Sequence, residues 1–364
     1  MTRATLAAAL FTLVAGCRQP EPLAIGISVN PEGVAAARLA AAEINAAGGI
    51  DGRPLALHEA ADGRATQAQP AIAAADAFVH DRSVLAVVGH GNSSASLAAA
   101  QIYNAAHLPQ IAPTTTAARY TQAGPFSFRL VPSEQGQAVV LARRALAAGR
   151  SARLAVFYVN DDYGRGLHAG LDSELQRLGL DVVYEAPYLE TVSPNQVDGP
   201  LAAVSRASPD LLFWLGRLPE LLPMLAPLRA ALPRLTILGS DGVEAAPIYT
   251  DPRCRGIGFV RFVDLEAADA GLVRFRQQLW QQRGYALTGS AVLTYDAVKL
   301  VTAALRDGAR SREAVRAYLA TVGRSRPPFR GLSGAIAFDE QGDVTRPYQL
   351  VTIGRDRVEA GGWQ

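Results

Sequence analysis

The sequence predicts an α/β protein with two lobes, each built around a mainly parallel β-sheet. Short apolar runs of strand length alternate with longer segments of helical spacing, and this alternation begins again near Phe126. Alternating strands and helices favour right-handed βαβ units, whose strands lie parallel in one sheet. A chain of 364 residues also exceeds the usual limit of a single hydrophobic core. Two such series in a chain of this length therefore predict two lobes.

The first series extends from residue 23 to residue 112. Its strands are continuous apolar runs, such as Leu85-Ala86-Val87-Val88, as expected where a parallel sheet is covered on both faces. Its first helix ends at Gly48-Gly49, residues that readily adopt the left-handed conformation of a C-cap. The predicted strands cover residues 23–29, 55–58, 85–89 and 109–112, and the predicted helices cover residues 32–47, 68–80 and 93–106.

The second series is followed by a helical tail and a predicted C-terminal β-hairpin. The hairpin strands cover residues 335–338 and 348–351, because a turn-rich segment over 339–343 separates two apolar runs. The predicted helices of this half cover residues 135–148, 164–178, 197–207, 220–231, 271–283, 292–307 and 312–322. The predicted strands cover residues 154–158, 182–184, 211–215, 236–238 and 256–260.

The amino-terminal segment predicts export and a lipid anchor. Arg3 gives a positive start, and residues 4–14 form an uncharged run that is too short to span a bilayer but suits a signal peptide. The run ends in Leu13-Val14-Ala15-Gly16-Cys17, which resembles the lipobox of bacterial lipoproteins. We therefore expect a signal peptide over residues 1–16, lipidation of Cys17 and a tether over residues 17–22. An ordinary signal peptide with an incidental Cys is the alternative.

Composition and charge exclude several classes of protein. The formal net charge is +2 and the arginines are scattered, so no nucleic-acid footprint is expected. No other run approaches the ~20 apolar residues of a membrane span, so we expect the rest of the chain to be soluble. If Cys17 is acylated, Cys254 has no partner for a disulfide and is expected to be a small buried residue.

Sequence motifs of catalysis and of cofactor or metal binding are missing from the chain. It contains no Gly-x-Gly-x-x-Gly after a strand, no P-loop and no Gly-x-Ser-x-Gly. His58-Glu59 lacks the second His of a zinc helix motif, and Asp161-Asp162 suits a polar loop better than a metal site. His90 could belong to a site or be a hydrogen-bonded structural residue. We therefore expect no enzyme, no cofactor and no bound metal.

The loops after the predicted strands hold the candidate binding residues, because ligands of open α/β sheets bind beyond the carboxyl ends of strands. Ser93 and Ser94 follow the third strand at a helix start, where free N–H groups and hydroxyls suit an anion, although a simple N-cap is the alternative. Thr114 and Thr116 follow the fourth strand and could equally form a polar turn.

Two loops of the second series add an aromatic ring and a carboxylate. Tyr163 follows the strand over 154–158 and could cover a ligand, or pack within its own lobe. Asp241 lies in Gly239-Ser240-Asp241-Gly242 and could pair with an ammonium, although Asp is also an ordinary turn residue. Together with the serines, these loops predict a site for a small molecule that carries both an anionic group and an amine.

Several stretches resemble the leucine/isoleucine/valine-binding proteins of ABC importers, in family order over essentially the whole chain after residue 22. They are residues 43–55, 88–90 with Ser93-Ser94, 163–166, 239–242, 295–299 and 338–343. The resemblance implies the type I periplasmic-binding fold, with two Rossmann-like lobes joined by a three-stranded hinge. It implies crossovers near residues 129–133, 260–264 and 331–335. The first lobe would then comprise residues 23–130 and 262–332, and the second residues 131–261 and 333–364.

The same resemblance implies how an amino acid or similar small molecule is held. Ser93 with its adjacent backbone, and Thr116, would hold the ligand α-carboxylate. Thr114 through its carbonyl, Thr116 and Asp241 would hold the α-ammonium. Tyr163 would close over the ligand from the second lobe as the hinge moves. No cofactor is implied, and the partners are the membrane permease subunits of an ABC importer.

The sequence departs from the family pattern in three respects. The loop over residues 28–33 is shorter and lacks an aromatic side chain, Arg217 stands where a tyrosine is usual, and no disulfide can form. A more open pocket with an added cation would favour a polar, acidic or larger ligand, unless Arg217 pairs with a carboxylate across the cleft. The predicted function is a lipid-anchored substrate-binding protein in the periplasm or at the cell surface, and the alternative is a ligand sensor of the same fold.

Overall fold

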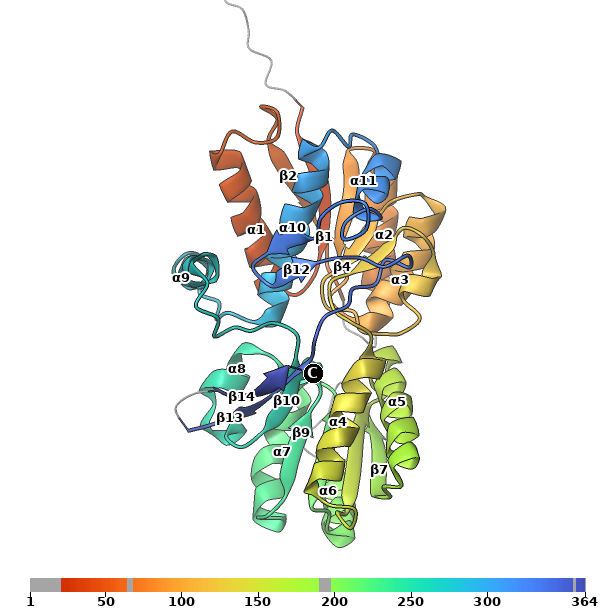
Figure 1. The fold of residues 1–364 in the computed structure, drawn as a ribbon, viewed down its shortest axis with the longest axis vertical. Helices are drawn as coiled ribbons and strands as arrows, with labels where there is room; N and C mark the ends of the chain where they lie inside the picture. Colours follow the sequence, from red (N-terminus) through yellow and green to blue (C-terminus); the bar gives the residue numbers. More distant parts are fainter. Residues whose placement is uncertain (1–20, 64–67, 190–197, 356–357, 364) are drawn as a thin grey trace, which may run out of the picture.

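The computed structural model describes residues 21–63, 68–189, 198–355 and 358–363, which form two lobes stacked along the long axis of the molecule (Figure 1). Each lobe is a β-sheet with helices on both faces. The predicted signal peptide and the predicted lipidation site Cys17 lie outside the described residues. Among the helices of the described ranges, none is both long and apolar enough to cross a membrane.

The first sheet has five parallel strands. Their order is β2 (Leu55–Glu59), β1 (Leu23–Ser28), β3 (Val84–Gly89), β4 (Gln110–Ala112) and β5 (Ser127–Arg129). Ile25 and Ile27 pack against the side of α1 (Pro31–Ala46) and α10 (Gly289–Arg306). Ala24 packs on the other face, with α2 (Gln69–His80) and α3 (Ser93–Ala105). The strands are thus covered on both faces, as their continuous apolar runs predict.

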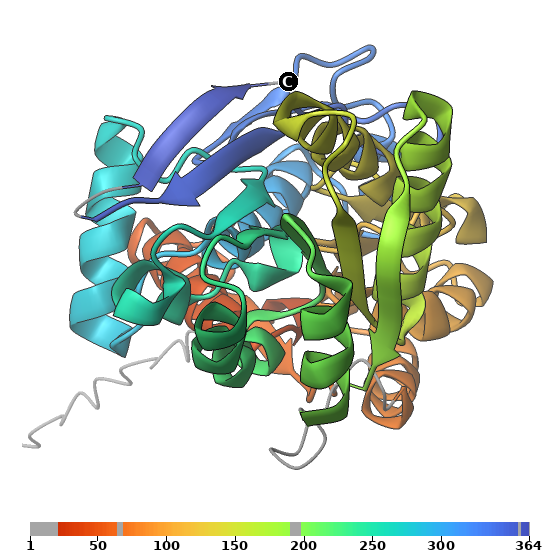
Figure 2. The same ribbon diagram turned by 90° about the horizontal axis from the view of Figure 1, so that it is seen from below.

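The second sheet has seven strands. Their order is β14 (Val358–Trp363), β13 (Gln349–Ile353), β10 (Gly258–Arg261), β9 (Thr236–Gly239), β8 (Leu211–Leu215), β6 (Leu154–Val159) and β7 (Val182–Tyr188). The strands from β6 to β10 are parallel, whereas β13 is antiparallel to both of its neighbours. Figure 2 shows the C-terminal strands β13 and β14, in blue, at one edge of the sheet.

Helices also cover both faces of the second sheet. The side of α4 (Glu134–Ala148) and α5 (Asp162–Leu178) receives Val156 and Phe213, and the opposite side receives Phe157 and Trp214. The helices on that opposite side are α6 (Asp198–Ala207), α7 (Leu218–Ala231) and α8 (Ala246–Thr250). The predicted α/β class with two parallel-sheet lobes is confirmed by these two sheets.

The predicted C-terminal hairpin is wrong. The segment predicted as its first strand forms β12 (Gly334–Ile336), which pairs with β11 (Phe329–Gly331). The segment predicted as its second strand forms β13, which pairs with β10 and β14. The segment between them is closed by a bridge between Phe338 and Val344 and by a hydrogen bond from the N–H of Asp339 to the carbonyl of Asp343 at 2.8 Å. The local sequence pattern located the two apolar runs correctly, but the strands with which they pair could not be read from that pattern.

The third passage between the lobes falls later than residue 333. Phe338 packs edge-on against Phe128 of β5, with ring centroids 5.2 Å apart. Asp343 accepts a hydrogen bond from Nε of Arg129 at 2.7 Å, so residues up to 343 contact the first lobe. The next residues lead directly into β13 of the second sheet. We therefore propose a lobe boundary between residues 344 and 349.

The remaining helices follow the second passage, after β10, and return to the first lobe. Phe275 of α9 (Ala270–Arg283) packs against Tyr295 of α10 with ring centroids 4.7 Å apart. Then α11 (Arg312–Leu319) follows α10, and its Arg312 donates to the carbonyl oxygens of Val84 and Phe78. The first contact joins α9 to α10, and Tyr295 in turn donates to Glu43 of α1. The contacts of Arg312 attach α11 to the α2 side of the first lobe.

Candidate functional site

A cavity of about 370 Å³ lies between the two lobes. It sits beyond the carboxyl ends of the parallel strands of both sheets, the position at which open α/β sheets bind ligands. Of the predicted binding residues, the cavity is lined by Ser93 and Thr114 from the first lobe and by Tyr163, Arg217 and Asp241 from the second. It is also lined by Asn30, Glu32, Asp62, Gly91, Glu244 and Ser290, among others.

The first turn of α3 contributes backbone N–H groups to the first-lobe wall. Asn92 is the N-cap of this helix, and its side chain accepts a hydrogen bond from the N–H of Ala95 at 2.9 Å. Because Asn92 is the cap, Ser93 and Ser94 belong to the helix itself. The first N–H groups of an α-helix have no intrahelical acceptor and carry the positive end of its dipole. A helix start of this kind is able to bind an anionic group.

Ser94 and Thr116, which were also predicted as binding residues, are not among the residues that line this cavity. Ser94 Oγ accepts a hydrogen bond from the backbone N–H of Asp162 at 3.3 Å, so it bridges the two lobes. Thr116 is fully buried, and its carbonyl oxygen accepts from the N–H of Glu134 at 2.9 Å. Thr114 does face the cavity, and its hydroxyl donates to the carbonyl of Gly91 at 3.1 Å.

His90 is a structural residue behind the cavity wall. Its side chain is fully buried, with Nδ1 at 2.8 Å from Asp62 Oδ1 and at 3.0 Å from Ser28 Oγ. Its Nε2 lies 3.1 Å from the hydroxyl of Tyr103. The second oxygen of Asp62 accepts from the N–H of Gly91 at 3.0 Å. This network fixes the loop that precedes α3, and hence the position of the helix start.

Asp241 is held by two side chains of its own lobe. Its Oδ1 accepts hydrogen bonds from the Tyr163 hydroxyl at 2.6 Å and from Gln137 Nε2 at 2.7 Å. Gln137 Oε1 accepts in turn from the backbone N–H of Asp241 at 2.7 Å. Removal from bulk water raises the pKa of the Asp241 carboxyl, and the hydrogen bonds from Tyr163 and Gln137 act in the opposite direction. A ligand ammonium would stabilise the ionised form of this carboxyl.

Arg217 pairs within the second lobe rather than across the cleft. Its Nη2 donates to Asp161 Oδ2 at 2.8 Å, and its guanidinium carbon lies 5.5 Å from the centroid of the Tyr163 ring. Asp161 is also the N-cap of α5, and its Oδ1 accepts from the N–H of Gly164 at 2.8 Å. The positive charge of Arg217 is therefore balanced by a buried carboxylate of its own lobe.

Glu32 and Glu244 line the cavity but were not among the predicted binding residues. Glu32 lies in the first turn of α1, and Glu244 follows the 3-10 turn η3 (Asp241–Val243). Both residues lie just beyond the ends of strands, and this position in the sequence could have identified them as candidate binding residues. An acidic residue in a first helical turn is also common for reasons of helix stability alone, so the sequence did not single them out.

The lobes also touch beside the cavity. The guanidinium of Arg119 pairs with the carboxylate of Asp162, next to the contact made by Ser94. Glu134, at the start of α4, accepts a hydrogen bond from the backbone N–H of Ala118 at 3.3 Å. Burial raises the pKa of Glu134 to about 8. These contacts join the second lobe to the first-lobe loop that follows β4.

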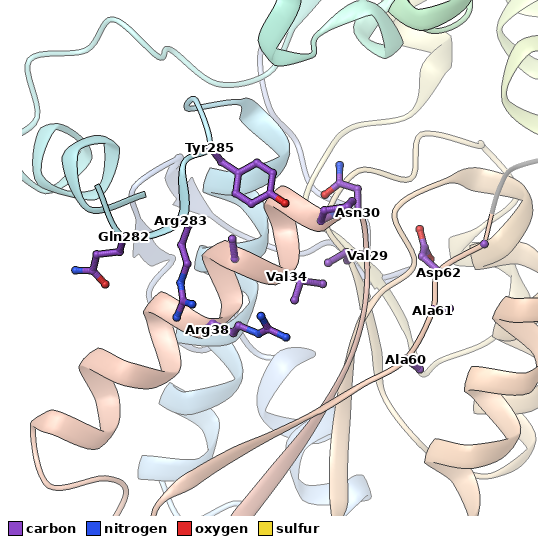
Figure 3. A pocket seen from close by; sticks show the side chains of 13 residues that line it. Val29, Asn30, Val34, Arg38, Ala60, Ala61, Asp62, Gln282, Arg283 and Tyr285 are labelled. Atoms are coloured by element: carbon purple, nitrogen blue, oxygen red, sulfur yellow. The ribbon is translucent and has the colours of Figure 1, made fainter. Parts of the chain in front are cut away.

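A second cavity of about 770 Å³ adjoins the first and shares Asn30, Asp62 and Gly63 with it. Figure 3 shows Arg38, from α1, and Arg283 and Tyr285, from the end of α9 and beyond, on its far side. Two residues connect β1 to α1, and one of them, Asn30, lines both cavities. In the part of the chain that the structure describes, no cluster of His, Cys, Asp or Glu suits a metal.

The family of the chain is shown by comparison with known proteins. The model of the periplasmic binding protein family matches residues 24–358. The chain belongs to this family. An amino acid binding protein of Pseudomonas aeruginosa is 26% identical over 316 residues, which are 84% of this chain and 80% of that protein. Leu/Ile/Val-binding protein homolog 1 of Brucella abortus is 27% identical over 320 residues, which are 85% of this chain and 82% of that protein.

Solved structures agree with this assignment at the level of the fold. The substrate-binding protein LivJ of Streptococcus pneumoniae, in complex with isoleucine, superposes with a TM-score of 0.83 at 21% identity, covering 94% of this chain and 99% of that one. A solute-binding protein of R. palustris in complex with benzoate superposes with a TM-score of 0.82 at 16% identity, covering 94% of this chain and 96% of that one. The resemblance to the leucine/isoleucine/valine-binding proteins and the type I periplasmic-binding fold are thereby confirmed.

Proposed function

We propose that this periplasmic binding protein is the extracytoplasmic substrate-binding component of an ABC importer and that it holds an amino acid in the cleft between its lobes. One observation carries the proposal: a helix start with free N–H groups and the carboxylate of Asp241 face one cavity from opposite lobes. A zwitterionic α-amino acid matches this arrangement, since its carboxylate suits the helix start and its ammonium suits Asp241.

The roles of the side chains follow from their places in the cavity wall. Ser93 and the N–H groups of α3 would bind the α-carboxylate, and Asp241 would bind the α-ammonium. Tyr163 would orient Asp241 and cover the ligand from the second lobe. Ser94 and Thr116 would act indirectly, because Ser94 bridges the lobes and Thr116 supports the start of α4.

Hinge closure of the two lobes around the ligand would exclude water and create the form that permease subunits recognise. Contacts between Ser94, Arg119 and Asp162 already join the lobes beside the cavity. The chain would act by binding and not by catalysis. A ligand sensor of the same fold would use the same closure, and reconstitution of ligand uptake with a permease would separate the two functions.

A ligand screen tests the amino-acid assignment. The purified chain is refolded to remove carried-over ligand, and its thermal unfolding is followed with amino acids, small carboxylates, amides and aromatic acids. A ligand at about 100-fold over its Kd should stabilise the protein by about 2.7 kcal/mol, which shifts the Tm by a few degrees. Stabilisation by α-amino acids supports the proposal. Stabilisation only by carboxylates that lack an amine would contradict the role of Asp241.

Lipidation of Cys17 is part of the proposed function and has its own test. The lipobox-like sequence before Cys17 supports an anchor in the membrane, with the two lobes outside the cytoplasm. In cells, Cys17→Ala should release the protein from the membrane fraction while ligand binding stays unchanged. Fractionation with immunoblotting measures the distribution. Persistent membrane association of the variant would exclude the lipid anchor.

A further inference from the structure

We propose that the cleft selects an amino acid whose side chain ends in a cationic group that donates hydrogen bonds, such as an ammonium or a guanidinium. This inference rests on the proposed function, because it assigns the α-groups of the ligand to Ser93 and Asp241. The remaining question is which chemical group meets the rest of the cavity wall.

The charges that line the cavity are mostly negative. Four carboxylates, those of Glu32, Asp62, Asp241 and Glu244, line it, together with the guanidinium of Arg217. Arg217 is already paired with a carboxylate outside the cavity wall. A zwitterionic backbone adds no net charge, so a ligand with a neutral side chain would leave this excess uncompensated. Closure around such a ligand would take carboxylates out of water without a cation in the cavity itself to balance them, which is unfavourable.

Two of these carboxylates come from opposite lobes and flank the first turn of α10. Glu32 Oε1 accepts a hydrogen bond from Asn30 Nδ2 at 2.9 Å, and the same Nδ2 lies 3.1 Å from Ser290 Oγ. Glu244 Oε1 accepts from the backbone N–H of Gly289 at 3.0 Å. Glu32 and Glu244 are therefore linked through adjacent residues of α10, at one end of the cavity.

The hydrogen bonding of these two carboxylates is one-sided, because the side-chain and helix N–H donors around them converge on a single oxygen of each. The side-chain hydrogen bond from Asn30 reaches Oε1 of Glu32, and the hydrogen bonds from Gly289 and Tyr249 both reach Oε1 of Glu244, whereas both oxygens of Asp62 are engaged. Desolvation raises the pKa of Glu32 and of Glu244. A cation placed between them would stabilise both ionised carboxylates. It would also bridge the lobes and thereby favour the closed form.

The competing explanation is that Glu32 and Glu244 serve only the helices beside them. Carboxylates are favourable near helix N-termini, and Glu32 lies in the first turn of α1 while Glu244 binds the N-terminus of α10. That role would leave the choice of ligand unaffected. A measurement of ligand preference therefore separates the two explanations.

The test uses two pairs of ligands that differ in charge at the side-chain end. The purified full chain, freed of carried-over ligand, is titrated calorimetrically with L-arginine and L-citrulline, and with L-lysine and L-norleucine. The cationic member of each pair should bind at least about ten-fold tighter, a typical effect of one well-placed charge pair. Glu32→Gln and Glu244→Gln should each reduce this ratio by about ten-fold. Glu313→Gln, a change of a 62% exposed carboxylate on α11, is the control and should leave the ratio unchanged.

The possible outcomes separate this inference from the proposed function. Equal or tighter binding of citrulline and norleucine overturns the inference and leaves an amino-acid-binding protein. A preference for cations that survives in both variants overturns the assignment to Glu32 and Glu244. If no amino acid binds to a chain that circular dichroism shows to be folded, the proposed function fails and this inference fails with it. If Glu244→Gln does not fold, the ligand preference of Glu32→Gln decides between the two explanations.

Discussion

The two lobes present different groups to the part of the cavity in which we place the α-carboxylate and α-ammonium of the ligand. The first lobe presents the N–H groups of α3 and the hydroxyls of Ser93 and Thr114, whereas the second lobe presents the charged side chain of Asp241. The first-lobe groups are fixed by the backbone and by a buried network around His90. The second-lobe carboxylate is fixed by two side chains, Tyr163 and Gln137.

This difference between the lobes indicates which one is more sensitive to single substitutions in its affinity and specificity for a ligand. A backbone N–H at a helix start persists whatever side chain replaces Ser93, so the anion site is a property of the fold. The position and charge of Asp241 depend on few atoms, which one substitution can remove. Among the residues that we place around the α-groups of the ligand, we therefore expect substitutions in the second lobe to alter affinity more than substitutions in the first.

The largest expected effect is that of Asp241→Ala, which should weaken binding of the amino-acid ligand by about 2–4 kcal/mol because the ammonium loses its partner. Calorimetric titration of the variant measures this loss. Asp307→Ala, which removes an exposed carboxylate at the end of α10, should keep the original Kd. Unchanged affinity in Asp241→Ala would remove the amine-binding role and the asymmetry between the lobes.

Glu134 should make stability depend on pH where the two lobes meet. Its pKa is raised to about 8, so the folded state keeps a proton that the unfolded state loses above its ordinary value of 4.5. The free energy of unfolding should therefore fall as pH rises from about 4.5 to 8, by up to about 1.4 kcal/mol per pH unit. Urea denaturation across this range measures the slope, and Glu134→Gln should flatten it. An equal slope in the variant would assign the effect to other groups.

Tyr163→Phe should weaken ligand binding by about 1 kcal/mol, the usual contribution of one hydrogen bond. The variant keeps the ring beside Arg217 but loses the hydroxyl that donates to Asp241 and accepts from the N–H of Gly242. Calorimetry gives the change in Kd, with Tyr158→Phe of β6 as the matched control. If both variants bind equally well, Gln137 alone suffices to position Asp241.

Ser94→Ala should have the smallest effect, a loss of affinity of about 0.5 kcal/mol. The substitution removes the single hydrogen bond from the N–H of Asp162, which forms only where the lobes meet. The same titration measures it. A loss larger than that of Tyr163→Phe would reverse the comparison and give a first-lobe side chain the greater share of affinity.

Much of the site was predictable because strand ends and helix starts are local features. Ser93, Thr114, Tyr163, Arg217 and Asp241 follow apolar runs directly, and all of them line the cavity. Their proposed roles in ligand binding stay predictions. Arg217 was expected to favour a polar, acidic or larger ligand, or to pair with a carboxylate across the cleft. Its guanidinium instead binds Asp161 of its own lobe, which lies 56 residues away in sequence.

By itself the sequence determined the α/β class, the two series of elements and most of their bounds, because apolar periodicity and turn residues act over a few neighbouring positions. Only the tertiary structure decided the pairing of β12 and β13 and the neighbours of Asp241. Gln137 lies 104 residues from Asp241, and Glu32 and Glu244 are linked through adjacent residues of α10. Such contacts join parts of the chain that are distant in sequence, so they cannot be predicted from a pattern of neighbouring residues.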